Sequence, residues 1–234
     1  MVLDALSDMM FGLIVIVAAL AAGAGIINLG SFFHNKLKDL FNDVNYFIFF
    51  FLVTGYSLYA LGEVSYYLTQ VIFKNASQIG IQDLYWTAGG LLILISFITM
   101  TNVLMKEHGN SSMLMKQLLY GGLLTVLVLA IVFGVGGSNY SFGYVYPIIS
   151  ALIVSSALSV IFFSRYLGDF EQVLFLLFLA SIGILAGDLL FHYTEAIGIY
   201  GFLGFLSDIF YLLGYGLSFV AFIVMRLKIK AIKV

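Results

Sequence analysis

Long apolar runs, separated by short polar or glycine-rich stretches, recur along this chain of 234 residues. A helix that crosses the hydrocarbon core of a bilayer needs roughly 20 consecutive, mostly apolar residues. The runs that meet this requirement cover about 8–31, 45–72, 83–105, 114–136, 144–166, 171–194 and 200–226. Composition agrees with them, because 62% of the residues are hydrophobic and only 9% are charged. We therefore predict an all-α integral membrane protein with seven transmembrane helices, multi-pass in the cell membrane, whose residues 1–234 form one domain.

The basic residues predict how these helices are oriented. If the helices alternate in direction, almost all Lys and Arg side chains fall on one side of the membrane: Lys36, Lys38, Lys106, Lys116, Arg165, Arg226, Lys228, Lys230 and Lys233. Only Lys74 falls on the other side. Because cytoplasmic loops carry the excess of Lys and Arg, we predict an N-terminus outside and a C-terminus inside. The acidic N-terminal segment lacks the basic region of a signal peptide, so the first run is expected to remain as a helix.

An internal repeat is visible within the apolar runs. Residues 62–102 align without a gap on residues 187–227, each residue with the one 125 positions later. The paired positions include Gly62-Glu63 with Gly187-Asp188, Thr69 with Thr194, Asp83 with Asp208, Gly89 with Gly214 and Met100 with Met225. The coincident acids carry most of the information, since acids are scarce in membrane segments.

The repeat predicts a 3+1+3 architecture. Helices 1–3 form repeat one (8–105), helix 4 is a linker (114–136), and helices 5–7 form repeat two (144–227). Each triplet begins outside and ends inside, so the repeats are parallel and related by an axis along the membrane normal, as in some transporters. The alternative is coincidence between segments built from few residue types.

Polar and aromatic side chains gather on single faces of three helices. On helix 6, Ser181, Asp188, His192 and Glu195 share one side, and helices 2 and 7 carry similar stripes with Glu63 and Asp208. The predicted topology places the acids in the outer half of the membrane, where they would form an outward-facing acidic, aromatic pocket for a cation, an amine or a polyhydroxy ligand. The candidate ligand-binding residues are Glu63, Asp83, Asp188, His192 and Asp208, with Tyr66, Trp86 and Tyr211 as lining.

Two other interpretations of these residues stay open. Asp83 and Asp208 can cap the starts of helices 3 and 7, and Glu63 and Asp188 can be packing groups that are hydrogen-bonded to tyrosines. Asp188, His192, Glu195 and Asp208 together resemble a ligand set for Zn, Mn or Fe, but the matching positions of the first repeat are poorer ligands. We therefore assign no metal and no cofactor.

Several function classes are disfavoured. A net charge of −2 offers no basic surface for nucleic acid, and the absence of cysteine excludes thiolate metal sites. Retinal is not expected, because helix 7 has no lysine before Arg226 for a Schiff base. Neither a phosphate-binding loop nor a Gly-Xaa-Ser-Xaa-Gly elbow is present, and we predict that the chain is not an enzyme.

The segments LGEVSYYLTQVIF, IQDLYWTAGGLLILISF and GDLLFHYTEAIGIYGFLGFLSDIFYLLGYGLSFV resemble multi-span sensor domains of prokaryotes, which precede diguanylate cyclase or histidine kinase modules. The likeness covers about a third of the chain. The proline that often flanks the Asp of that pattern is missing, since the only proline is Pro147. The output module is missing too, so the resemblance implies signalling through a separate partner. The predicted topology also resembles that of SWEET sugar transporters and opsins.

We therefore predict a membrane receptor or sensor that binds a small ligand, cation or proton in the outer pocket and signals through a cytoplasmic or membrane partner. The alternative is a small-solute or ion transporter or channel that uses the same duplicated triplets. A metal-dependent membrane hydrolase is the third alternative.

Overall fold

The structure is a computed structural model that describes residues 2–33, 37–74, 80–108, 111–134, 142–163, 166, 168–198 and 201–232. It consists of the long helices α1 (Val2–Phe32), α2 (Val44–Tyr66), α3 (Ile81–His108), α4 (Ser111–Gly134), α5 (Phe142–Ile161), α6 (Glu171–Ile197) and α7 (Gly201–Ile232). Short helical segments are η1 (Leu37–Asp39), the π-helix η2 (Tyr67–Ile72), which continues α2, and η4 (Gly168–Phe170). Over these ranges the structure contains no strand, so the all-α prediction is confirmed.

Six of the long helices are long and apolar enough to cross a membrane: α1, α2 with η2, α3, α5, α6 and α7. In α4 the apolar stretch that the structure describes is shorter, Leu119–Gly134. The outer surfaces of the helices carry exposed aliphatic side chains such as Ile16, Leu20, Leu91 and Leu213. Apolar side chains that face outward from such helices are what a lipid environment requires, and the chain is a helical membrane protein.

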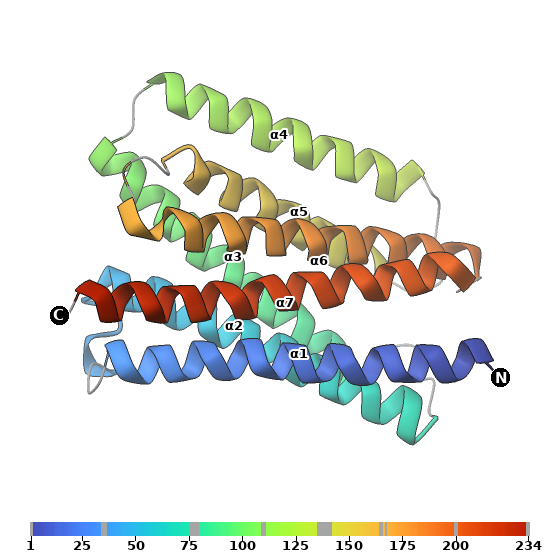
Figure 1. Ribbon diagram of the computed structural model, residues 1–234. Coiled ribbons are helices and arrows are strands. Elements are labelled where there is room, and N and C mark those ends of the chain that lie inside the picture. The colour runs from blue at the N-terminus through green and yellow to red at the C-terminus, as the bar shows by residue number, and fades with distance from the viewer. Residues whose placement is uncertain are drawn as a thin grey trace.

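Six helices close a ring, and α4 stays outside it. Around the ring α1 packs on α2, α2 on α3, α3 on α5, α5 on α6, α6 on α7, and α7 on α1. Helices α1, α7 and α6 form the front layer in Figure 1, with α2, α3 and α5 behind them. Helix α4 packs mainly on α5, at the edge of the ring. The N- and C-termini lie at opposite ends of the bundle (Figure 1).

Glycines bring two helix pairs into close contact. A Cβ atom on Gly89 of α3 would lie 2.8 Å from the carbonyl oxygen of Gly55 in α2. A Cβ atom on Gly214 of α7 would lie 3.1 Å from the carbonyl oxygen of Ala180 in α6. Small residues at such crossings let the helix backbones approach one another within a membrane. The repeat pairs Gly89 with Gly214, and Gly55 and Ala180, just before its two segments, are also 125 positions apart.

Along the length of the bundle, the interior of one half is filled by a packed core of aromatic and aliphatic side chains. Its central rings are Phe49, Tyr56 and Phe222, with ring centroids 6.3 Å apart for Phe49–Phe222 and 5.5 Å apart for Tyr56–Phe222. Phe97 and Phe163 are buried beside them. This core occupies the half that contains the C-terminal part of α7, and the other half contains the cavity described next.

Candidate functional site

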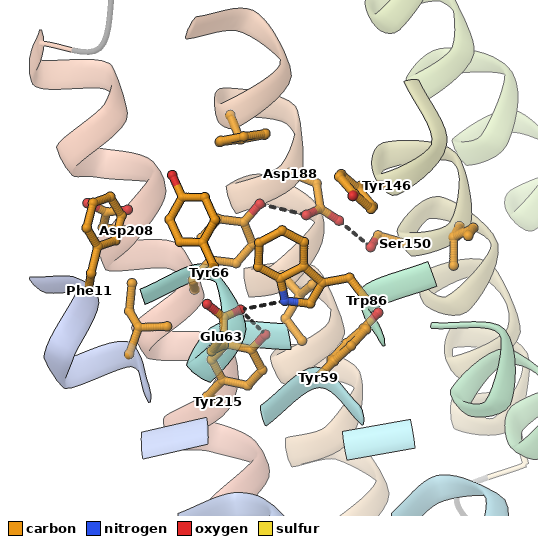
Figure 2. A pocket seen from close by; sticks show the side chains of 15 residues that line it. Phe11, Tyr59, Glu63, Tyr66, Trp86, Tyr146, Ser150, Asp188, Asp208 and Tyr215 are labelled. Atoms are coloured by element: carbon orange, nitrogen blue, oxygen red, sulfur yellow. Dashed lines mark hydrogen bonds between the residues drawn. The ribbon is translucent and has the colours of Figure 1, made fainter. Parts of the chain in front are cut away.

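A cavity lies inside the ring, between α1, α2, α3, α5, α6 and α7 (Figure 2). The centres of water-sized molecules can occupy about 60 Å³ of it. On that measure one buried water needs about 10–15 Å³, so the cavity has room for roughly four to six waters or a solute of similar size. Its lining is Phe11, Ile14, Tyr59, Glu63, Tyr66, Trp86, Tyr146, Ile149, Ser150, Ile184, Asp188, Phe191, Asp208, Tyr211 and Tyr215.

Glu63 of α2 is held by side chains from two other helices. The indole Nε1 of Trp86 in α3 donates to Glu63 Oε1 at 3.1 Å. The hydroxyl of Tyr215 in α7 donates to the same oxygen at 2.7 Å. Figure 2 shows both hydrogen bonds meeting at one carboxylate oxygen. The carboxylate therefore ties α2 to both α3 and α7 and keeps a fixed position at the cavity.

Asp188 of α6 is held in a similar way. The hydroxyl of Tyr211 in α7 donates to Asp188 Oδ1 at 2.7 Å. Ser150 Oγ in α5 donates to Asp188 Oδ2, the second bond drawn at this residue in Figure 2. The Asp188 side chain is buried, and each of its oxygens accepts one hydrogen bond, as a buried carboxylate requires.

The surroundings of the two carboxylates share one aromatic donor and one glycine. Glu63 accepts a hydrogen bond from Trp86, and Asp188 accepts one from Tyr211. The repeat pairs Trp86 with Tyr211 at its offset of 125. The residue before each acid is a glycine on which that aromatic ring packs. A Cβ on Gly62 would lie 2.5 Å from the Trp86 ring, and one on Gly187 would lie 2.9 Å from the Tyr211 ring.

Aromatic rings form a continuous wall along the cavity. Phe11 meets Tyr66 with centroids 5.4 Å apart, Tyr66 meets Trp86 at 5.5 Å, and Trp86 meets Tyr146 at 5.7 Å. The wall therefore runs from α1 through α2 and α3 to α5. Its rings meet edge to face or tilted, arrangements that aromatic side chains prefer to a face-to-face sandwich. The cavity is thus bounded by fixed aromatic groups.

Most of the predicted site residues come together here. The cavity is lined by Glu63, Asp188, Asp208, Tyr66, Trp86 and Tyr211. Asp83 and His192 are not part of its lining. Both are buried, and each binds a neighbouring helix or helix start.

Asp83 stabilises the start of α3. Its Oδ2 accepts from the backbone N–H of Gly80 at 2.6 Å, while its own N–H donates to the Gly80 carbonyl at 3.2 Å. The first of these bonds is the acidic half of a capping box, in which the side chain at the third helical position accepts from the N–H of the residue before the helix. The hydroxyl of Tyr146 in α5 donates to Asp83 Oδ1. The capping interpretation therefore fits Asp83.

Asp208 differs from Asp83, although the repeat pairs them. Helix α7 begins at Gly201, so Asp208 lies about two turns inside it and is too deep to cap its start. The Asp208 side chain is buried and lines the cavity. Its neighbour Ser207 donates to the Gly187 carbonyl at 2.8 Å and fixes α7 against α6.

His192 connects α6 to α4. Its Nε2 donates to the carbonyl of Val132 at 3.1 Å, within the last turn of α4, and its ring packs 5.0 Å from that of Tyr144. The last carbonyls of a helix have no partner inside the helix, so a side-chain donor there stabilises its end. Across the described ranges, no three His, Cys, Asp or Glu side chains converge as metal ligands.

The sequence interpretation missed the contribution of α1 and α5. Phe11 and Ile14 come from α1, and Tyr146, Ile149 and Ser150 come from α5. Phe11 and Ile14 look like ordinary apolar residues of a membrane helix. In α5 the only local indication of a cavity-facing side in the sequence was the spacing of Tyr146 and Ser150, which are four positions apart and so share one helix face.

Comparison with protein families, with curated proteins and with solved structures finds no match in any of the three.

Proposed function

We propose that this protein is a membrane receptor or sensor that binds a small ligand in the cavity inside the helix ring. The observation that carries the proposal is the pair of carboxylates, Glu63 and Asp188, which aromatic donors hold in fixed positions at an aromatic-lined cavity. Polar groups inside a membrane bundle are costly, and where they surround space they mark binding sites or conduction pathways. A ligand that contacts them would bridge both triplets at once.

We further propose that seven helices span the cell membrane with the N-terminus outside, and that the chain is a duplicated 3+1+3 unit. The distribution of Lys and Arg supports the orientation, and the opposite positions of the termini support an odd number of crossings. The matching contacts of Glu63 and Asp188 support the duplication.

In this orientation the cavity lies in the outer half of the protein. Glu63 precedes the end of η2 at Ile72 by nine residues, and Asp188 precedes the end of α6 at Ile197 by nine residues. At the 1.5 Å rise of an α-helix this is about 13 Å from the outer end of α6, and the distance from the end of the π-helical η2 is no larger. The packed core around Tyr56 and Phe222 would close the inner half.

Signalling would follow from occupancy of the cavity. Since Glu63 binds side chains of α3 and α7, and Asp188 binds side chains of α5 and α7, a ligand at these carboxylates would shift one triplet against the other. A cytoplasmic or membrane partner would detect the change at the inner end of α7. The basic residues there, from Arg226 onward, can also serve only to anchor the helix at anionic lipid.

A small-solute carrier is the second candidate, and the matching contacts of the two triplets favour it. In transporters built from parallel repeats the substrate site lies at the repeat interface, and the repeats rock about it. The inner core would then have to open during transport. A metal-dependent hydrolase has less support, because His192 contacts α4 and does not line the cavity.

A thermal-stability screen in detergent tests the binding function. Divalent cations, amines, sugars and a pH series are compared on the wild type, on Asp188→Asn and on Glu171→Gln, a loss of one carboxylate charge at the exposed start of α6, outside the cavity lining. We expect one solute class to raise the melting temperature of the wild type and of Glu171→Gln but not of Asp188→Asn. No effect of any class would contradict the proposal.

Uptake into proteoliposomes then separates receptor from carrier. The active solute is given at one side of vesicles that contain either the wild type or Asp188→Asn. A receptor predicts equal accumulation in the two kinds of vesicle. Greater accumulation in wild-type vesicles than in Asp188→Asn vesicles would identify the protein as a carrier.

A further inference from the structure

We propose that the ligand of the cavity is a small organic ammonium ion, seated between Glu63 and the aromatic wall. The inference rests on the proposed function and narrows it to one chemical class of ligand. Four properties of the cavity support this inference: its charge, an unused acceptor atom, its aromatic lining and its size.

The charged groups at the cavity all have the same sign. Glu63, Asp188 and Asp208 line it, and among the described lining residues none is Lys, Arg or His. The side-chain donors bonded to the first two acids are neutral: an indole N–H, two tyrosine hydroxyls and a serine hydroxyl. Neutral donors orient a carboxylate and leave its charge uncompensated, so the cavity attracts a cation and repels an anion.

Glu63 keeps one oxygen for a ligand. Both of its hydrogen bonds end on Oε1, and no residue of the described ranges donates to Oε2. The side chain is partly exposed at the cavity. An ammonium N–H bonded to Oε2 would form a charge-assisted hydrogen bond, which is about twice as strong as a neutral one.

The aromatic wall suits an organic cation better than a hydrated metal ion. Tyr66, Trp86 and Tyr146 line the cavity in series, and Trp86 is bonded to Glu63. An ammonium ion or its alkyl groups gain cation–π attraction within about 6 Å of such a ring centroid. A divalent metal ion instead needs several converging oxygen or nitrogen ligands, and the described acids do not converge in that way.

The size of the cavity limits the ligand to a small amine. Room for roughly four to six waters corresponds to about as many non-hydrogen atoms. Methylammonium and tetramethylammonium fall within this limit. A hexose, with twelve non-hydrogen atoms, does not.

The only tryptophan of the chain provides the measurement. Trp86 lies in the aromatic wall and donates to Glu63, so its fluorescence reports events at the cavity without interference from another tryptophan. The protein in detergent is titrated with methylammonium and tetramethylammonium chloride at constant ionic strength, with potassium, calcium and glucose as comparison solutes. Trp86→Phe verifies the origin of the signal, and the melting temperature of each variant verifies that it is folded.

We expect a saturable change in Trp86 emission with the ammonium ions. In Glu63→Gln the half-saturating concentration should rise about tenfold or more, because the charge-assisted hydrogen bond is lost. In Glu171→Gln it should stay unchanged. A wild-type melting temperature that rises with the same ammonium ion would agree.

Three results would overturn the inference. A response to calcium or glucose, but not to the ammonium ions, would replace the ligand class and leave the binding function intact. An ammonium response of equal half-saturation in wild type and Glu63→Gln would place binding elsewhere. No response in either fluorescence or melting temperature to any solute class would contradict the proposed function as well.

Discussion

A glycine beside each central carboxylate determines where the aromatic donor can lie. The Trp86 ring packs on Gly62 and reaches Glu63, and the Tyr211 ring packs on Gly187 and reaches Asp188. Any side chain at 62 or 187 would occupy the space of the ring. At these two positions the absence of a Cβ is therefore a requirement of the site itself.

Gly62→Ala should destabilise the protein and weaken ligand binding. Its Cβ would lie 2.5 Å from the Trp86 ring, so the ring must move away from Glu63. We expect a loss of about 1–3 kcal/mol in unfolding free energy, as for other overpacked sites, and an altered Trp86 emission.

Gly216→Ala is the control, because nothing lies within 4 Å of a Cβ at this position of α7. It should leave the stability unchanged or raise it by up to about 1 kcal/mol. Thermal unfolding in detergent compares the two variants, and equal melting temperatures would contradict the account of Gly62.

Asp83→Ala should lower stability through the start of α3. The change removes the acceptor of the Gly80 N–H and of the Tyr146 hydroxyl. Loss of a cap costs about 0.5–2 kcal/mol, and the unpaired hydroxyl adds to this. Asp83→Asn keeps one acceptor oxygen and should recover part of the loss. A melting temperature of Asp83→Ala equal to that of the wild type would argue against the capping role.

Residue roles were only partly predictable from the sequence. The coincidence of acids at the repeat offset identified Glu63 and Asp188, because an acid inside an apolar run has few structural uses. It treated Asp83 and Asp208 alike. However, Asp83 lies in the first turn of α3, which begins at Ile81, whereas Asp208 lies more than a turn deeper in α7, which begins at Gly201. Helix starts depend on how the preceding loop docks, which periodicity does not encode.

At the scale of helices, the apolar runs predicted the number and order of the elements well. A spanning helix satisfies its own backbone hydrogen bonds, so its position follows from local composition alone. Which helices neighbour one another is a tertiary property. The closure of the ring by α1 on α7 and by α3 on α5 therefore escaped prediction, and with it the contribution of Phe11 and Tyr146 to the cavity.

The contact between α6 and α4 gives a prediction at this scale. His192→Phe removes the donor to the Val132 carbonyl, and we expect a loss of about 1 kcal/mol in stability with an unchanged response to ligand. The neighbouring Tyr193→Phe, at an exposed position, should have no effect on either property. Melting temperature and Trp86 emission are the measurements. A normal stability combined with a lost ligand response would make His192 a binding residue after all.

At the scale of the whole molecule, several contacts of α1, α2 and α3 have counterparts in α5, α6 and α7. The crossing of α2 and α3 at Gly89 matches the crossing of α6 and α7 at Gly214, and the acid–aromatic pairs match as well. The ring neighbours also correspond, since α1 lies between α2 and α7 as α5 lies between α6 and α3. These correspondences support duplication more strongly than sequence identity between apolar segments does.

Single cysteines test the proposed topology without background, because the chain has no cysteine of its own. Phe41→Cys, Phe73→Cys and Phe202→Cys place thiols at exposed positions in different connections or helix ends. With seven crossings and the N-terminus outside, an impermeant thiol reagent added to intact cells should label positions 73 and 202 but not 41. Labelling of 73 without 202 would mean that α4 does not cross, and labelling of 41 alone would reverse the orientation.

The rate at which a cysteine at position 150 is modified tests the central claim, a cation-selective cavity inside the ring. Ser150 lines the cavity and donates to Asp188. Ser150→Cys is treated with cationic 2-aminoethyl and anionic 2-sulfonatoethyl methanethiosulfonate, and the ratio of the two rates is compared with that of Phe73→Cys. We predict that the ratio of the cationic to the anionic rate is about tenfold or more higher at Ser150→Cys than at Phe73→Cys, as for a cavity lined by one sign of charge. We also predict that methylammonium slows the modification of Ser150→Cys. Equal ratios at the two positions, without protection by methylammonium, would contradict the account.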